Sequence, residues 1–258
     1  LQSNDSYNKE VIPYAEMFGP TKIEIKDSDG NGTLELVLTS NPPTYGTTSY
    51  SMGLPWRDET HIFGWNGNSF VLFRTTYSPP EFRFQAVQDG DRATLLGDYD
   101  AALDYYQQAI FSDQLDWWSY DRWEYEVRQF AAVGEDETPT PMPTPSYDGA
   151  EYENLAAYSR FRILLLHTRR GWIPEAEIVY NTLKEKFLVG QAGYAYVEMA
   201  TAFWNEYHAS SDLSQACQKA IEYTTLHSEE ILSSLGDASS FFGSQSLDYE
   251  PEDVCPFR

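Results

Sequence analysis

The stretch Leu95–Ile110, LLGDYDAALDYYQQAI, decides how the larger part of the chain is interpreted. After Gly97 and Asp98, small and large side chains recur at the spacing of one helical face: Ala102, Tyr106 and Ala109. A Gly-Asp pair in front of such a period is typical of a turn that starts a new helix. The sequence therefore predicts a helix over residues 100–112, within a region that is helical from about residue 86.

This stretch resembles the second half of a tetratricopeptide repeat. The resemblance rests on Gly97, Tyr99, Ala102, Tyr106 and Ala109, and on Gly90, which lies where the first helix of such a repeat has a small residue. The same offsets recur in two weaker copies, Gly171, Ile173, Ala176, Tyr180 and Leu183, then Ser211, Leu213, Ala216, Ala220 and Tyr223. The copies start at residues 97, 171 and 211, whereas regular repeats are about 34 residues long. A plain antiparallel helical bundle is the alternative.

The resemblance implies stacked helix pairs whose inner helices form a concave surface for a protein or peptide partner. The aromatic residues that would contact this partner are Tyr105, Trp117, Trp118, Trp123, Tyr194, Tyr196 and Trp204. Aromatic side chains at helical spacing also fit a hydrophobic core, so this assignment competes with a packing role.

The first 85 residues show a different, two-residue period. Alternating apolar positions predict strands over 22–26 and 33–39. Two more strands, 61–65 and 70–75, flank Asn66-Gly67-Asn68-Ser69, and Asn-Gly between apolar runs favours a hairpin turn. We also predict a short strand over 81–86. The fold class is therefore α+β, with a small antiparallel β unit before the helical region.

Domain boundaries follow from these changes of period. We expect the β unit over residues 1–85, a first helical segment over 86–133, with a helix over 116–133, and a Thr/Pro-rich linker over 134–147. A second helical segment over 148–258 contains predicted helices at 151–170, 174–187, 190–208 and 212–235, followed by an irregular tail.

Between the first two strands lies DSDGNGTLE, residues 27–35. Alternate oxygen-bearing residues around a glycine turn are the ligands that calcium prefers. Leu38 stands where an EF-hand has its bidentate Glu, so this is not an EF-hand. The loop resembles the calcium loops of FG-GAP or VCBS-type repeats. That resemblance places calcium on Asp27, Asp29, Asn31, the Thr33 carbonyl and Glu35. A purely polar hairpin turn is the alternative.

The net charge of −23 argues against nucleic acid and anionic membranes as partners, because both attract basic proteins. Residues 98–137 are densest in acid, with eleven Asp or Glu against Arg122 and Arg128. This segment is either a solvated face or a surface for a cationic partner. No run of apolar residues is long enough to predict a transmembrane helix. Cys217 and Cys255 are either a disulfide or two free thiols.

We find no HExxH, GxSxG, phosphate-loop or dinucleotide motif, and therefore expect no enzyme. The leading hypothesis is an extracytoplasmic interaction or scaffold protein, secreted or surface-anchored, with a calcium-braced β unit and helices that bind a protein or peptide. The alternatives are a carbohydrate-binding or carbohydrate-active protein that uses exposed Trp and Tyr, and a structural lipoprotein domain.

Overall fold

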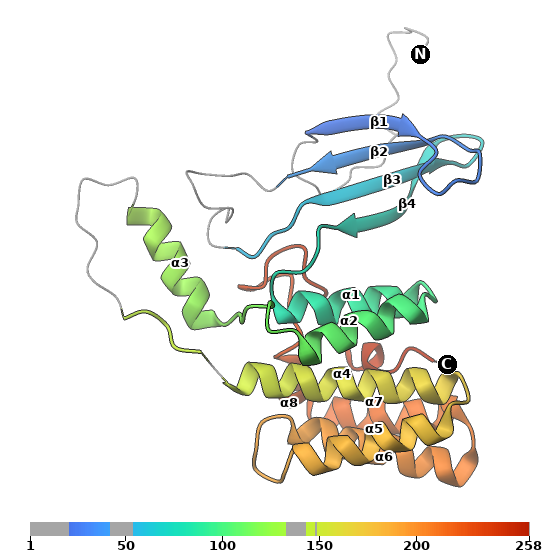
Figure 1. Cartoon of the computed structure of the whole chain (residues 1–258), viewed down its shortest axis with the longest axis vertical. Coiled ribbons are helices and arrows are strands. Elements are labelled where there is room, and N and C mark those ends of the chain that lie inside the picture. The colour runs from blue at the N-terminus through green and yellow to red at the C-terminus, as the bar shows by residue number, and fades with distance from the viewer. Residues whose placement is uncertain (1–20, 42–53, 133–142, 148, 258) are drawn as a thin grey trace, which may run out of the picture. The chain divides into compact units, whose positions relative to one another are not determined.

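The computed structural model describes residues 21–41, 54–132, 143–147 and 149–257, with side chains left out of account over 129–132. The chain divides after Pro79 into two compact units, one of strands and one of helices (Figure 1). The α+β fold class is thus confirmed, with an antiparallel sheet before a helical region. The first twenty residues and most of the Thr/Pro-rich linker lie outside the described residues.

The β unit is a four-stranded meander in the order β1-β2-β3-β4, with every neighbouring pair antiparallel. Its strands are β1 (Lys22–Lys26), β2 (Glu35–Ser40), β3 (Glu59–Trp65) and β4 (Phe70–Tyr77). Leu36, Leu38 and Phe63 form a small core, against which Phe70 packs. All four predicted strands in this region are present, with ends that differ from the prediction by at most two residues.

The turn between β3 and β4 forms where the Asn-Gly pair predicted it. Asn66 Oδ1 accepts hydrogen bonds from the backbone N–H of Asn68 and Ser69, at 3.0 and 2.9 Å. Gly67 has a φ of +100°, which residues with a Cβ rarely adopt. The local sequence therefore fixes the geometry of this turn.

The strand predicted over 81–86 is wrong, because α1 (Arg83–Leu95) begins there. The Gln85 side chain accepts hydrogen bonds from the backbone N–H of Glu81 and Phe82, which satisfies donors that an uncapped helix would leave open. Phe82 itself is extended and makes one isolated bridge to Asp116. The alternating Phe-Arg-Phe pattern thus reflects a single extended residue before a helix.

The helical unit is built around three antiparallel helix pairs. They are α1 with α2 (Tyr99–Phe111), α4 (Gly149–Arg169) with α5 (Ile173–Lys186), and α6 (Tyr194–Ser210) with α7 (Leu213–Leu226). Figure 1 shows α4 between the α1–α2 pair on one side and α5, α6 and α7 on the other. Within α4 the continuous stretch Leu155–Leu166 is buried, because α1, α2, α5 and α6 all pack against it.

Each pair turns at a residue in the left-handed conformation: Gly97 at a φ of +77°, Gly171 at +75° and Ser211 at +56°. These are the first positions of the three sequence copies. Asp98 and Asp212 then cap the second helices α2 and α7 by accepting backbone N–H bonds from Ala101 and Ser214. The three copies therefore mark three equivalent turns.

Three further elements complete the unit: α3 (Tyr120–Ala132), α8 (Ser228–Leu232) and the 3₁₀ helix η2 (Pro251–Val254). The sequence predicted one helix over 212–235, but the chain breaks at His227 between α7 and α8. As predicted, the segment after residue 235 has no long regular element. None of the helices in the described ranges is both long and apolar enough to span a membrane.

Candidate functional site

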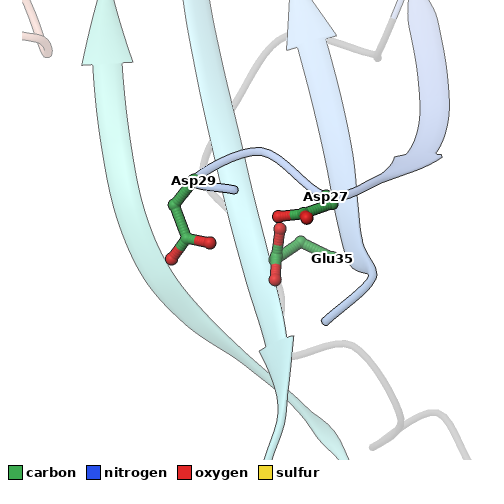
Figure 2. Close-up of side chains that lie close together, drawn as sticks. All are labelled: Asp27, Asp29 and Glu35. Atoms are coloured by element: carbon green, nitrogen blue, oxygen red, sulfur yellow. The ribbon is translucent and has the colours of Figure 1, made fainter. Parts of the chain in front are cut away.

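The loop between β1 and β2 is organised by its own carboxylates. Asp27 Oδ1 accepts the backbone N–H of Gly30 and Asn31, and Asp27 Oδ2 accepts that of Gly32 at 2.9 Å. Glu35, at the start of β2, accepts the backbone N–H of Ser28 at 2.7 Å. Gly30 and Gly32 both have positive φ. The loop therefore folds back on itself between the two strands (Figure 2).

Three carboxylates converge in this loop. Asp27, Asp29 and Glu35 each offer an oxygen within 4.8 Å of the other two. The aspartates are exposed and Glu35 is only 5% exposed. The backbone N–H of Gly32, followed by those of Gly30 and Asn31, lowers the pKa of Asp27, so this carboxylate stays ionised. Hard oxygen donors of this kind fit calcium.

The other two predicted ligands, Asn31 and Thr33, take part in hydrogen bonds of the turn itself. Asn31 Oδ1 accepts the backbone N–H of Thr33 at 2.7 Å, and the Asn31 amide donates to Asp29 Oδ2 at 2.9 Å. The Asn31 side chain thus stabilises the turn and orients Asp29. The same hydrogen bonds would hold the loop as a polar turn without an ion, so the geometry is compatible with both sequence interpretations.

The predicted partner-binding aromatics separate into two groups by burial. Trp118, Tyr196 and Trp204 are 2%, 0% and 5% exposed and pack in the core of the helical unit. They therefore do not form a contact surface or a sugar platform, and that part of the prediction is wrong. Side chains that keep partial exposure are Tyr105, Trp117, Trp123 and Tyr194.

Hydrogen bonds to the C-terminal part of the chain explain the burial of Trp118 and Tyr196. Trp118 Nε1 donates to the Phe241 carbonyl, and its ring packs 4.9 Å from that of Phe82. The Tyr196 hydroxyl donates to the Ile231 carbonyl at 2.6 Å. Both polar groups thus find partners on the C-terminal part of the chain, which sequence periodicity could not reveal.

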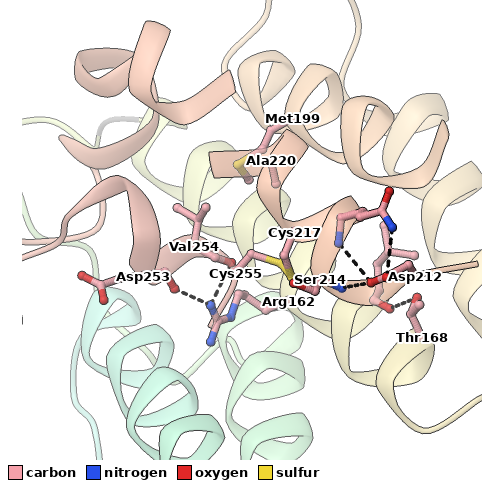
Figure 3. Close-up of a disulfide and its surroundings, with 12 residues drawn as sticks. Arg162, Thr168, Met199, Asp212, Ser214, Cys217, Ala220, Asp253, Val254 and Cys255 are labelled. Atoms are coloured by element: carbon pink, nitrogen blue, oxygen red, sulfur yellow. Dashed lines mark hydrogen bonds between the residues drawn. A yellow bond between two sulfur atoms is a disulfide. The ribbon is translucent and has the colours of Figure 1, made fainter. Parts of the chain in front are cut away.

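The C-terminal segment, residues 233–257, lies across α1 and α4 and is bonded to α7. On α1, Gln88 Nε2 donates to the Leu235 carbonyl and to Ser246 Oγ, and Arg92 donates to the Gln245 carbonyl. On α4, Arg162 Nη1 donates to the carbonyls of Asp253 and Val254 (Figure 3). The concave surface expected for a partner is therefore covered, over α1 and α4, by the chain itself.

A buried ion pair anchors this segment. Arg162 Nε lies 3.0 Å from Asp91 Oδ1, with both side chains nearly inaccessible to solvent. The hydroxyls of Tyr106 and Tyr249 each donate to Asp91 at 2.6 Å, and Tyr158 donates at 3.1 Å. Burial raises the pKa of all three tyrosines well above the ordinary value, so they remain protonated donors. A buried charge so fully paired is tolerated in a core.

Sequence reasoning missed this network, although one signal was present. Arg162 interrupts the apolar run of α4, Phe161 to Leu166, and an arginine in such a run requires a buried counter-charge. Nothing in the sequence marks Asp91 as that partner, because polar residues surround it.

The structure joins Cys217 of α7 to Cys255 by a disulfide (Figure 3). Both cysteines are buried, and the bond closes a loop of 38 residues. Cys255 directly follows the two carbonyls that Arg162 binds. The end of the chain is therefore held by a covalent bond and a buried guanidinium at the same place. Comparison of the chain with protein-family models, with curated proteins and with solved structures finds no match in any of the three.

Proposed function

We propose that this chain is a non-enzymatic, extracytoplasmic interaction protein. Its tetratricopeptide-like helix pairs bind a protein or peptide partner, and calcium braces the β1–β2 loop of its sheet. The observation that carries the proposal is the coincidence of three left-handed turns, at Gly97, Gly171 and Ser211, with the three copies of the repeat frame. Repeats of this kind usually serve as scaffolds for other chains.

The surface available to a partner differs from the one first expected. Because the C-terminal segment covers the inner face of α1 and α4, we place the partner on the partly exposed aromatic side chains of α2, α3 and α6. Tyr105, Trp123 and Tyr194 represent these three helices, and Trp117 precedes α3. Partly exposed Tyr and Trp are common anchors of protein interfaces.

Photo-crosslinking tests this placement. The source cell would produce chains with p-benzoylphenylalanine at position 105, 123 or 194, or at the control position Leu226, which is 80% exposed on α7. The proposal expects one defined crosslinked product at one or more of the three positions and none at 226. A crosslink pattern that is equal at all four positions, or absent from all, contradicts it.

Calcium binding is tested separately by thermal melting of the whole chain. Extracellular calcium modules bind in the range of about 0.1–1 mM, so about 10 mM calcium should raise the melting midpoint of the sheet while the same concentration of magnesium leaves it unchanged. An unchanged midpoint in calcium would leave only the polar-turn interpretation.

The disulfide supports the proposed compartment. Disulfides persist in oxidising surroundings and are rare in reducing cytosol. Rapid alkylation of cells that make this protein, followed by mass measurement, should find Cys217 and Cys255 unmodified before reduction and modified after it. Alkylation of both thiols without prior reduction would place the protein in a reducing compartment instead.

A further inference from the structure

A cavity of about 520 Å³ lies within the helical unit, at the start of α3 and α4. That volume is in the range of small-molecule sites. Four separate segments of the chain form its walls, and the lining residues are Trp118, Ser119, Tyr120, Asp121, Ser146, Tyr147, Ala150, Glu151, Asn154, Ser233, Ser234, Phe241 and Phe242.

Contacts that do not involve a ligand fix the walls of this cavity. Asn154 donates to Ser234 Oγ at 3.0 Å and accepts the Gly193 N–H at 2.7 Å. Trp118 Nε1 is bonded to the Phe241 carbonyl, and the ring of Tyr120 packs edge-on against that of Phe241 at 5.9 Å. The cavity is thus largely pre-formed, which limits the entropy lost when a ligand binds.

The charged side chains that line the cavity are of one sign. Its lining contains the carboxylates of Asp121 and Glu151 and no Lys, Arg or His among the described residues. Beyond the lining, the sequence has no Lys or Arg from 129 to 159, or from 220 to 257, although these stretches contain many acids. A concave site lined by carboxylates, in a chain with a net charge of −23, therefore concentrates negative potential.

Arg122, which follows the lining residue Asp121 in the sequence, is already paired. Arg122 lies 2.8 Å from Asp116 and donates to the Trp117 carbonyl, and its guanidinium stacks over the rings of Phe82 and Trp117. The helix N-termini of α3 and α4 add about half a positive charge each, which is less than the full charge of the carboxylate in each first turn. The net electrostatic potential at the cavity therefore stays negative.

Aromatic rings supply the second requirement for binding a cation. Tyr120 and Tyr147, which are 53% and 56% exposed, line the cavity together with Trp118, Phe241 and Phe242. The negative face of such rings attracts ammonium and guanidinium groups, more strongly where water is excluded. Asp121 is exposed, whereas both carboxylate oxygens of Glu151 are shielded from solvent, so Asp121 is the direct partner and Glu151 adds charge from within the wall.

We propose that this cavity binds an organic cation, an alkylammonium or guanidinium group, held between Asp121 and the rings of Tyr120 and Tyr147. The group belongs either to a free small amine or to a Lys or Arg side chain of a peptide. The proposal does not depend on the partner surface or the calcium loop above, because none of the residues assigned to either lines the cavity.

Calorimetric titration of the whole chain tests the chemistry with matched probes. Cadaverine should bind, and 1,5-pentanediol, which has the same length without charge, should bind at least roughly tenfold more weakly, because a charge-assisted contact is lost. An acetylated, amidated Gly-Lys-Gly peptide distinguishes the sources: tighter binding than cadaverine assigns the site to a peptide side chain, and weaker binding to a free amine. Equal binding of the diol, or binding of a neutral disaccharide in preference to the amine, overturns the proposal.

Variants separate this site from general attraction to an acidic protein. Asp121→Asn and Tyr147→Leu should each weaken cadaverine binding roughly three- to tenfold. Glu153→Gln is the control, because it removes the same charge from an exposed position on α4 outside the cavity, and it should leave binding unchanged. Glu151→Gln should weaken binding without direct contact. If all charge variants, Glu153→Gln included, weaken binding equally, the cavity is not the site.

Discussion

Gly90 of α1 lies directly against the ring of Tyr106 of α2. A Cβ at residue 90 would stand 2.5 Å from Tyr106 Cε1, closer than side-chain atoms approach one another in folded proteins. The Tyr106 ring is fully buried, and its hydroxyl is bonded to Asp91, so the ring cannot swing aside. The missing side chain at residue 90 therefore sets how closely the first helix pair packs.

We predict that Gly90→Ala destabilises the protein. Overpacking costs about 1–3 kcal/mol, and the better helix propensity of Ala returns up to about 1 kcal/mol, so a net loss of about 1–2 kcal/mol is expected. Urea unfolding measures it. Gly149→Ala is the control, because its Cβ would meet nothing nearer than 3.9 Å at the start of α4. A Gly90→Ala protein as stable as this control would show that the two helices can separate at no cost.

The sequence predicted the features that short segments determine by themselves. The Asn66–Ser69 hairpin and the turn at Gly97 depend on glycine and on local hydrogen bonds, and both form where expected. The start of α1 was predicted as a strand because Phe82, Phe84 and Ala86 alternate with polar residues. The burial of polar residues further along α1, such as Gln88, depends on partners some 150 positions away on the C-terminal segment. The residue pattern within α1 alone cannot predict that the C-terminal segment packs over it.

The site predictions differ in their outcome for the same reason, because some depend on one short segment and others on packing between distant segments. The convergence of Asp27, Asp29 and Glu35 follows from spacing within one loop, and the structure does bring these carboxylates together. Exposure of an aromatic residue, in contrast, depends on what the rest of the chain places on it. Trp204 was a candidate contact residue, yet it packs against Tyr180 of the neighbouring helix α5.

Tyr249 is predicted to hold the C-terminal segment onto α1. Tyr249→Phe removes the 2.6 Å bond to Asp91 Oδ2 and leaves a buried carboxylate with one donor fewer. A loss of about 1–3 kcal/mol in the free energy of unfolding is expected. Tyr223→Phe is the matched control, since the Tyr223 hydroxyl has no hydrogen-bond partner in the described part of the chain, and it should change stability by less than about 0.5 kcal/mol. Indistinguishable urea midpoints for the two variants would count against the anchoring role.

The disulfide should stabilise the helical unit mainly by restricting its unfolded state. For a loop of 38 residues, removing the bond is expected to cost about 3–4 kcal/mol. The double variant Cys217→Ala, Cys255→Ala should therefore unfold at lower urea, and reductant should lower the midpoint of the natural chain but not of the variant. If reductant has the same effect on both proteins, the stabilisation comes from elsewhere.

The three carboxylates of the β1–β2 loop repel one another in the absence of a cation. Removing one of them should therefore affect stability differently with and without calcium. Asp29→Asn removes one of these charges and keeps an oxygen that can accept the Asn31 backbone N–H bond. It loses only the exposed bond from the Asn31 side-chain amide, so the turn should still form. Without calcium the variant should be as stable as the natural chain or slightly more stable. With calcium it should lose most of the stabilisation, which for a site filled at 10–100 times its dissociation constant is about 1.4–2.7 kcal/mol. Glu24→Gln is the control, because Glu24 lies on β1 and pairs with Lys22 and Lys26 outside the loop. A calcium response that survives Asp29→Asn but is lost in Glu24→Gln would move the ion away from the loop.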